Sequence, residues 1–498
     1  MDQHSTVEGG RWGKIVVAAA FCIQVTGFGT TQSIGVYNIE WLRYFDAGAA
    51  AVSLVGAINL GVFLGAGPLA SVLMSRWSHR QVALLGAILS NLGLICMPFA
   101  PNLPFMYVFY GVISGLGNCL SYVPSHVLTG LYFSKHRSLA TGIATAGSGL
   151  GSTIFPIIMY HLIQHYGWRG SLFIVTGLNL HQILFAALLH PVPKDIQASV
   201  SCADELMEMK EKREMSKNLE TSQDIQEKLL NGKTCNDVKI VDGDFSNENG
   251  EIEVNEMENL SKATSAMLEC RKNSDTKLTT RVKLVNHLKT VFTVDFVIFF
   301  ISNICWNAGG AIVLIFYAEY AYTAGLDKED SSTVFTMCGA GACLGCILGG
   351  FLGNVKYFNR IWIYIVGNIG VGLISMLIPW RVMHTFWGLF MLIFIFGLMF
   401  GIILGLLVVV TSDLLGTKAL GDGFGYLMLA NGLGVFGGPP LAGILIDLYG
   451  SQDPAMYLSG AFSTMGGLIM CLVPLRRWLF PITEKQYLPS ITLEVVVE

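Results

Sequence analysis

The feature that most constrains the fold of this chain is a series of long segments that contain no charged residue. Residues 15–39, 81–134 and 331–355 have no Asp, Glu, Lys or Arg, and similar gaps recur along the sequence. Each gap holds a run of about 20 apolar residues, the length that an α-helix needs to cross a hydrocarbon core of roughly 30 Å. Because backbone polar groups in hydrocarbon must be paired internally, these runs predict an all-α membrane protein.

The charged residues are concentrated in one central segment. Residues 193–289 hold 15 of the 31 Lys and Arg residues and 19 of the 35 Asp and Glu residues. Such a segment buries too little apolar surface to offset its chain entropy, so we expect a disordered loop, either a solvated tether or a regulatory segment. The expected parts are an N-terminus (1–14), a first helical bundle (15–192), the loop (193–289), a second helical bundle (290–476) and a C-terminal tail (477–498).

Six apolar spans precede the loop and six follow it, which predicts 12 transmembrane helices in two six-helix halves. The expected spans are 15–38, 49–74, 82–100, 105–131, 139–163, 171–191, 292–317, 332–354, 361–380, 384–411, 423–446 and 456–475.

The basic residues of the connecting segments indicate how the spans are oriented. The connections that follow odd-numbered spans carry few of them: Arg43, Arg169, Lys328 and Arg381. The opposite side carries many more: Arg11, Lys14, Arg76, Arg80, Lys135, Arg137, the central loop, Lys356, Arg360, Lys418, Arg476 and Arg477. By the positive-inside rule, both termini and the loop are predicted to be cytoplasmic.

Small residues recur in the fifth and eighth spans. Gly142 and Gly149 belong to one series, and Gly345 and Gly349 to the other. In a bilayer such series admit close helix packing, which suits helices that rock against each other and equally suits static contacts. Cys343 and Cys346 form a C-x-x-C within the eighth span, where no His or second Cys pair accompanies them, so we interpret them as small packing residues rather than a metal or redox site.

Three stretches carry a family resemblance. Residues 132–151, YFSKHRSLATGIATAGSGLG, resemble the stretch YFxKRRxLAxGLAxAGSxxG of the monocarboxylate transporters (solute carrier family 16), within the major facilitator superfamily. Residues 432–443 are similar to span eleven of that family, and residues 166–170 to its turn into span six. The resemblance implies a major facilitator fold in the plasma membrane, with spans one, four, seven and ten lining a cavity. Members of the family often associate with a single-span ancillary glycoprotein, so such a partner is expected here.

The chain also departs from the family pattern where proton-coupled lactate carriers have charges. The opening motif survives only in part, within residues 8–14. Gln32 stands where those carriers have a lysine, and Ala342 and Cys346 stand where they have an Asp and an Arg four residues apart. Coupled proton transport usually needs an ionisable group within the membrane, and a substrate carboxylate needs a cationic partner there. The departures therefore disfavour proton-coupled lactate transport.

Neutral polar residues remain as candidates for substrate binding. They are Gln32 and Tyr37 in the first span, Asn118, Tyr122 and His126 in the fourth, and Asn303, Trp306 and Asn307 in the seventh. Interhelical hydrogen bonding is an equally good interpretation of each, because an unpaired amide in hydrocarbon costs several kcal/mol. Trp306 beside two amides is a candidate wall for a quaternary or guanidinium cation.

Charged residues near the expected cytoplasmic surface are candidates for a gate. Lys135 and Arg137 lie at the start of the fifth span, and Asp413 at the end of the tenth is their candidate partner. Anchoring of helix ends is an equally plausible role for the two cations. His126 is the candidate proton site within the membrane, because an unperturbed histidine titrates near pH 6.5.

These observations favour facilitated transport of a small polar organic solute, and the resemblance suggests creatine, carnitine or an amino acid. The alternatives are a proton-linked monocarboxylate symporter that uses His126, and a non-transporting sensor or scaffold that acts through the loop. No nucleophile, metal cluster or carboxylate pair lies in a span, so we do not expect an enzyme, a metal or a cofactor. The chain also has no basic stripe of the kind that binds nucleic acid. The expected partners are therefore the bilayer, the small-molecule substrate and, as the resemblance implies, a single-span ancillary glycoprotein.

Overall fold

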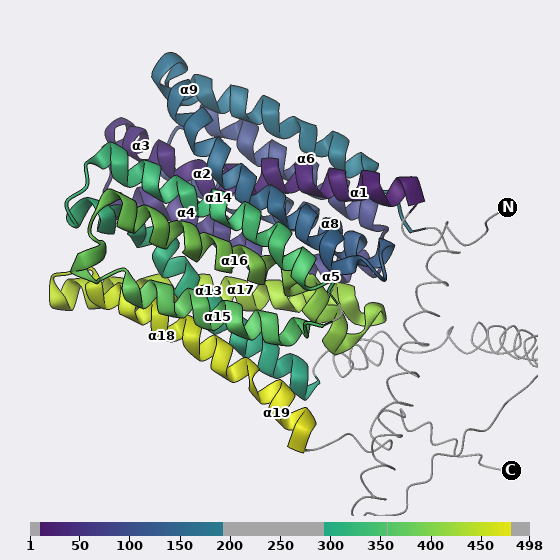
Figure 1. The fold of residues 1–498 in the computed structure, drawn as a ribbon. Coiled ribbons are helices and arrows are strands. Elements are labelled where there is room, and N and C mark those ends of the chain that lie inside the picture. The colour runs from purple at the N-terminus through teal and green to yellow at the C-terminus, as the bar shows by residue number, and fades with distance from the viewer. Residues whose placement is uncertain (1–9, 193–292, 356, 480–498) are drawn as a thin grey trace, which may run out of the picture. The chain divides into compact units, whose positions relative to one another are not determined.

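A computed structural model describes residues 10–192, 293–355 and 357–479, and its ordered elements there are all helices. The predicted loop at 193–289 lies outside the described residues, as do the two ends of the chain. Figure 1 shows the helices of both halves running side by side.

The first half contains six passages through the bundle. Its first passage runs unbroken from α1 to α3 but changes its winding at Gln24–Phe28, where η1 is a turn of π-helix. Such turns widen the helix locally and occur often at functional sites. The elements are α1 (Gly10–Ile23), η1 (Gln24–Phe28), α2 (Gly29–Ser33), η2 (Ile34–Tyr37), α3 (Asn38–Phe45), α4 (Ala49–Gly65), α5 (Gly67–Met74), α6 (His79–Cys96), η3 (Met97–Phe99), α7 (Leu103–Met106), η4 (Tyr107–Ser114), α8 (Gly115–Tyr132) and α9 (Arg137–Leu188).

The second half has longer and more regular helices. The elements of the second half are α13 (Val294–Thr323), α14 (Lys328–Leu352), α15 (Arg360–Leu377), η5 (Arg381–Met383), α16 (Phe386–Leu415), η6 (Thr417–Ala419), α17 (Leu420–Tyr449), α18 (Asp453–Met470) and α19 (Leu472–Leu479). Side-chain oxygens of Thr293, Asn359 and Thr385 accept hydrogen bonds from the first turns of α13, α15 and α16, so these helices begin at capping residues.

The structure agrees with the expected number of spans. Ten helices in the described part of the chain are long and apolar enough to cross a membrane, and the pair α4 and α5, bent by 41°, makes an eleventh. One of the ten, α9, has 52 residues, about 78 Å at 1.5 Å per residue, which is more than twice what one crossing needs. Gly167 breaks it with φ 66° and ψ 172°, so α9 contains the fifth and sixth spans. The described residues therefore supply 12 spans.

Alternation of the spans brings the basic connections to one end of the bundle. We call this the basic end; it contains Arg76, Arg137, Arg360, Arg476 and Arg477. In Figure 1 the start of α1, α5 and α19 lie toward the right, at this end, whereas α3 and the turn within α9 lie toward the left.

The two halves pack against each other through small residues, as the glycine series predicts. A Cβ atom added to Gly142 of α9 would lie 2.6 Å from the carbonyl oxygen of Cys346 and 2.7 Å from Cα of Gly350, both in α14. Gly67 of α5 and Gly425 of α17 form a similar close approach between the halves. Cys343 and Cys346 thus lie in a helix interface, where both are free thiols.

Candidate functional site

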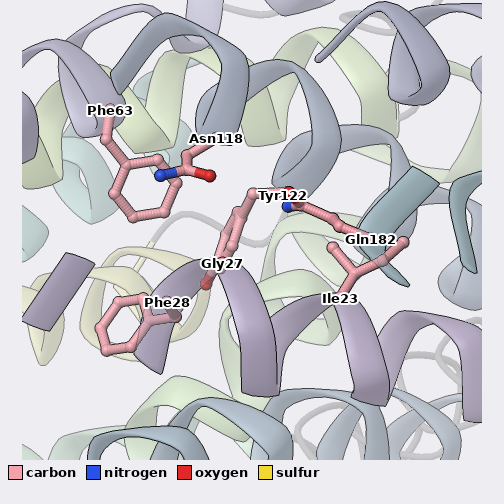
Figure 2. Close-up of a pocket in the computed structure, with 7 residues that line it drawn as sticks. All are labelled: Ile23, Gly27, Phe28, Phe63, Asn118, Tyr122 and Gln182. Carbon is pink, nitrogen blue, oxygen red and sulfur yellow. The ribbon is translucent and has the colours of Figure 1, made fainter. Parts of the chain in front are cut away.

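A small pocket lies within the first half, in the part of the bundle where the π-helical turn interrupts the first span (Figure 2). Its lining side chains leave less space than one water molecule needs, whereas the smaller ligand sites hold ~300 Å³. A solute would therefore have to part the helices in order to bind. Its lining residues carry no charge; they are Ile23, Gly27, Phe28, Phe63, Asn118, Tyr122 and Gln182.

Two of the predicted residues, Asn118 and Tyr122, lie in the pocket wall. The Asn118 side chain is paired at both of its polar atoms: its oxygen accepts a hydrogen bond from Ser90 at 2.7 Å, and its nitrogen donates to Thr31 at 2.9 Å. The Tyr122 ring packs edge-on against Phe63, at 5.2 Å between centroids, and stacks at 6.4 Å with Phe424 of the second half. The pocket wall therefore touches both halves.

His126 lies one helical turn beyond Tyr122, with the two rings 4.4 Å apart. Nε2 of His126 is 2.8 Å from the amide nitrogen of Gln24. An amide nitrogen donates and does not accept, so in this arrangement Nε2 of the imidazole is the acceptor and carries no proton. Both side chains are buried, and Nδ1 of His126 has no partner among the described residues.

Gln182, in the second span of α9, is a wall residue that the sequence analysis missed. Its side chain is only 1% exposed, and its Oε1 atom has no hydrogen-bond partner within the described part of the chain. The signal that could have found it is an amide inside an apolar span, but the resemblance directs attention to spans one, four, seven and ten. Gln24 and Thr31 were missed as partners of predicted residues, although both are polar residues of an apolar span.

The predicted residues of the seventh span form a separate polar cluster with α17. Asn307 donates to the side-chain oxygen of Asn431 at 2.8 Å, and Asn303 donates to the same oxygen. The Asn303 oxygen accepts from the Tyr364 hydroxyl at 3.3 Å. Sequence reasoning missed Asn431. This arrangement is the interhelical hydrogen bonding that was the alternative interpretation of these amides.

Trp306 lies beside this cluster but outside the pocket. It is fully buried, and its ring lies 4.8 Å from that of Phe400 in α16. Its indole nitrogen has no partner among the residues that the structure describes. Trp306 is therefore packed against the tenth span in this structure.

The two candidates in the first span differ in their surroundings. Gln32 is half-buried and follows Phe28 by four residues, so it lies on the same helical face as the pocket, one turn further along. Tyr37 is fully buried in an aromatic cluster, stacks on Trp41 at 5.6 Å and accepts a hydrogen bond from Ser171 at 3.0 Å. The structure thus places Tyr37 away from the pocket, in a packing environment.

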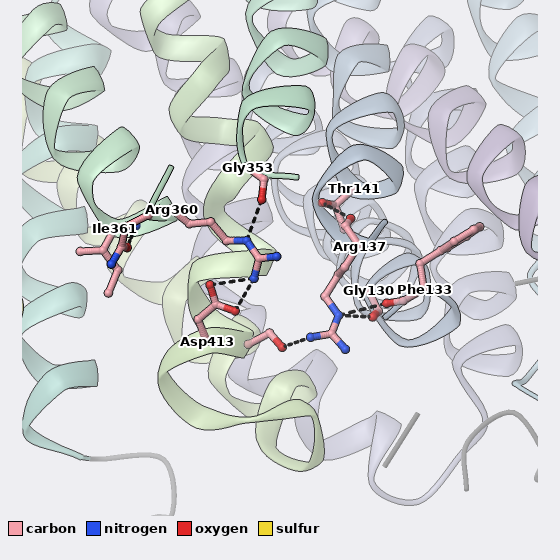
Figure 3. Close-up of polar contacts among 10 residues, drawn as sticks. Gly130, Phe133, Arg137, Thr141, Gly353, Arg360, Ile361 and Asp413 are labelled. Carbon is pink, nitrogen blue, oxygen red and sulfur yellow. Dashed lines mark hydrogen bonds and ion pairs between the residues drawn. The ribbon is translucent and has the colours of Figure 1, made fainter. Parts of the chain in front are cut away.

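The candidate gate residues meet at the basic end (Figure 3). Arg137 is 6% exposed; it donates to the carbonyl oxygens of Gly130 and Phe133 and crosses to Ser412 of the second half at 2.7 Å. Asp413, the candidate partner of Lys135 and Arg137, forms a salt bridge with Arg360 of its own half, at 2.8 and 3.1 Å, and lies near enough to Arg137 for the two charges to attract each other. Lys135 is exposed. The arginine of one half therefore binds the residue next to the aspartate.

Two further contacts join the halves at the basic end. The Ser71 hydroxyl of α5 donates to the carboxylate of Asp422 in α17, and the side chains of His136 and Asn354 lie 2.8 Å apart. With the Arg137 bond and the close approach of Gly142 to Gly350, these contacts tie the two halves together at that end.

Comparison with known proteins identifies the group to which this architecture belongs. The family model of the Major Facilitator Superfamily matches residues 18–354 and 294–493. Monocarboxylate transporter 9 of Gallus gallus is 28% identical over 479 residues, covering 94% of each chain. Monocarboxylate transporter 14 of Homo sapiens is 24% identical over 490 residues, covering 95% of this chain and 92% of the relative.

A solved structure with a similar fold is that of the proton:xylose symporter XylE bound to 6-bromo-6-deoxy-D-glucose. It has a TM-score of 0.62 and 14% sequence identity, and covers 94% of this chain and 96% of its own. At that identity the likeness concerns the fold alone. With the superfamily model matched across both halves, the chain belongs to the Major Facilitator Superfamily, as a multi-pass membrane protein with the 12-span fold of that group.

Proposed function

We propose that this transporter carries a small polar organic solute, such as creatine, carnitine or an amino acid, by alternating access and without coupling to protons. The observation that carries the proposal is the uncharged pocket wall formed by Asn118, Tyr122 and Gln182. Neutral amides and aromatic faces bind a solute whose own charges are balanced or dispersed, whereas a lone carboxylate in a low-dielectric site needs a cation. We also propose that the protein lies in the plasma membrane with its basic end in the cytoplasm.

The main alternative is a proton-linked carrier of monocarboxylates, the solutes that give the relatives their name. Such a carrier would use His126, which contacts both Gln24 and the Tyr122 ring. The two hypotheses differ in their dependence on external pH. Uptake linked to proton entry accelerates as the outside becomes acidic, whereas uptake of a zwitterion through a neutral site stays nearly constant.

The test is uptake of labelled creatine, carnitine, lactate and a set of neutral amino acids into cells that express the protein, at external pH 6 and pH 7.5. We expect one of the zwitterionic solutes to enter at similar rates at both values. We expect lactate uptake to equal that of cells without the protein. Lactate uptake that rises steeply at pH 6 and is lost in the His126→Gln variant would overturn the proposal in favour of the proton-linked carrier.

A second pair of variants separates a carrier from a sensor. Gln32 lies on the pocket face of the first span, so Gln32→Ala should change the apparent affinity of a carrier for its solute. Deletion of residues 200–280 should leave the transport rate per molecule at the surface nearly unchanged. The opposite pattern, in which the deletion abolishes function and the Gln32 variant is silent, supports the sensor.

A further inference from the structure

Gln182 lines the pocket with an amide whose oxygen has no hydrogen-bond partner among the described residues. Asn118, the other amide of the wall, is paired at both ends with Ser90 and Thr31. In contrast, Oε1 of Gln182 is buried and has no partner among the described residues. A buried polar atom without a partner costs free energy, more so within a membrane, so its retention in a pocket wall points to a partner that arrives from outside the chain.

The residues around this amide are a glycine, which lets the amide lie close to the first span, and three aromatic residues. A Cβ atom at Gly27 would lie 2.8 Å from the Gln182 nitrogen, so a larger residue at position 27 would push the amide out of place. Phe28, Phe63 and Tyr122 complete the wall with aromatic rings, and Figure 2 shows Gln182 and Tyr122 side by side at the pocket. An acceptor oxygen among aromatic faces suits a positively charged N–H group, because the faces attract a cation and the oxygen accepts a hydrogen bond from its N–H.

We propose that Oε1 of Gln182 accepts a hydrogen bond from an N–H group of the transported solute and thereby selects amines and guanidines over their fully N-methylated analogues. This inference rests on the proposed function, since it assigns a binding residue and a solute class to the same pocket. It goes further by choosing among the solutes proposed there. A quaternary ammonium has no N–H to donate, whereas creatine and the amino acids have at least one.

The experiment uses glycine and its N-methyl, N,N-dimethyl and N,N,N-trimethyl derivatives as competitors for the labelled solute in cells that express the full chain. Each methyl group removes one N–H while the positive charge and the carboxylate persist. We expect a drop of roughly tenfold in apparent affinity at the last step, where the last N–H is lost, because a charged hydrogen bond contributes about that factor. The Gln182→Leu variant should lose this step, and Gln182→Glu should retain it.

The matched control is Asn91→Ala. Asn91 is a buried amide of the same half but outside the pocket; its nitrogen donates to backbone oxygens of Ala87 and Asn179, and its oxygen, like that of Gln182, has no partner among the described residues. This variant should keep the step even where its surface expression falls. An undiminished step in Gln182→Leu, or a wild-type protein that binds the trimethyl compound as well as the dimethyl one, would overturn the inference while leaving the proposed function standing.

A labelling experiment tests the same residue without relying on transport. Gln182→Cys should react with a small membrane-impermeant thiosulfonate more than the wild type does, because the solute path admits water, and added solute should slow the reaction. Leu184→Cys is the control, because Leu184 is 58% exposed on the outer surface of the bundle, where lipid covers it. If Gln182→Cys is as inert as Leu184→Cys, position 182 lies off the path and the inference fails. If no solute of the panel enters cells with the wild-type protein, the proposed function fails, and labelling still decides whether Gln182 faces the path.

Discussion

Arg137 is a side chain that joins the two halves at the basic end. Its guanidinium is buried against the backbone oxygens of Gly130 and Phe133 and reaches Ser412 in the other half. An arginine is suited to this position because its planar fork carries five donors and stays charged. These contacts stabilise the arrangement of the two halves that the structure describes.

Replacement of Arg137 by Met should therefore destabilise the structure described here. Met preserves much of the apolar stem but leaves the buried acceptors that Arg137 binds without their donor, and we expect a loss of roughly 3 kcal/mol. Thermal unfolding of the purified protein in detergent measures this as a lower Tm. Arg76→Met is the control, because Arg76 is exposed at the same end and its loss should leave the Tm unchanged. Equal effects in the two variants would show that Arg137 acts through net charge and not through its contacts.

At the scale of the helix, the turn between the two spans of α9 depends on one backbone position, Gly167. Gly167 lets its two spans follow each other without a loop, because φ of 66° with ψ of 172° is a region that glycine occupies and other residues avoid. The turn is then fixed by Arg169, which donates to the carbonyl oxygen of Pro98 at 2.9 Å and lies 4.5 Å from the rings of Tyr44 and Trp168.

The Gly167→Ala variant should lose about 1–3 kcal/mol of stability through backbone strain. Steric overlap contributes nothing, since a Cβ atom there would meet no atom within 4 Å. Gly177→Ala is a matched control, because Gly177 is helical, belongs to the same α9 and also faces open space. It should be neutral or slightly stabilising, because alanine favours helix over glycine. A Tm for Gly167→Ala at or above that of Gly177→Ala would contradict the strain argument.

At the scale of the whole molecule, the sequence predicted the fold far better than the site. Charge-free runs of membrane length are nearly sufficient to place 12 spans, because a chain that crosses hydrocarbon must pair its backbone polar groups internally, as an α-helix does. Asn118 and Tyr122 were found because they stand out as polar residues in an apolar helix. Gln182 was missed, and the salt bridge between Asp413 and Arg360 was not expected, because contacts between different helices depend on the rotation of each helix about its axis. That rotation is set by packing against neighbours, which one sequence does not reveal.

The contacts at the basic end lead to a prediction about the transport cycle. If the halves rock about a central site, the bond between Ser71 of α5 and Asp422 of α17 must break whenever the basic end opens. The hydrogen bond brings the two side chains within reach of a short thiol crosslinker. We therefore expect the double variant Ser71→Cys/Asp422→Cys to transport its solute when reduced and to lose nearly all uptake when crosslinked.

Addition of reductant should restore the uptake when the crosslink is a disulfide, which separates locking from damage. Each single cysteine variant, treated in the same way, controls for reaction with the native cysteines. The same pair also shows on which side the solute is blocked. The crosslink keeps the basic end closed, and that end must open to release solute into the compartment that it faces. Solute should still bind from the other side while net flux stops. Uptake that continues at the rate of the uncrosslinked variant, with complete crosslinking shown on a gel, would mean that the halves do not separate here and that the solute takes another path.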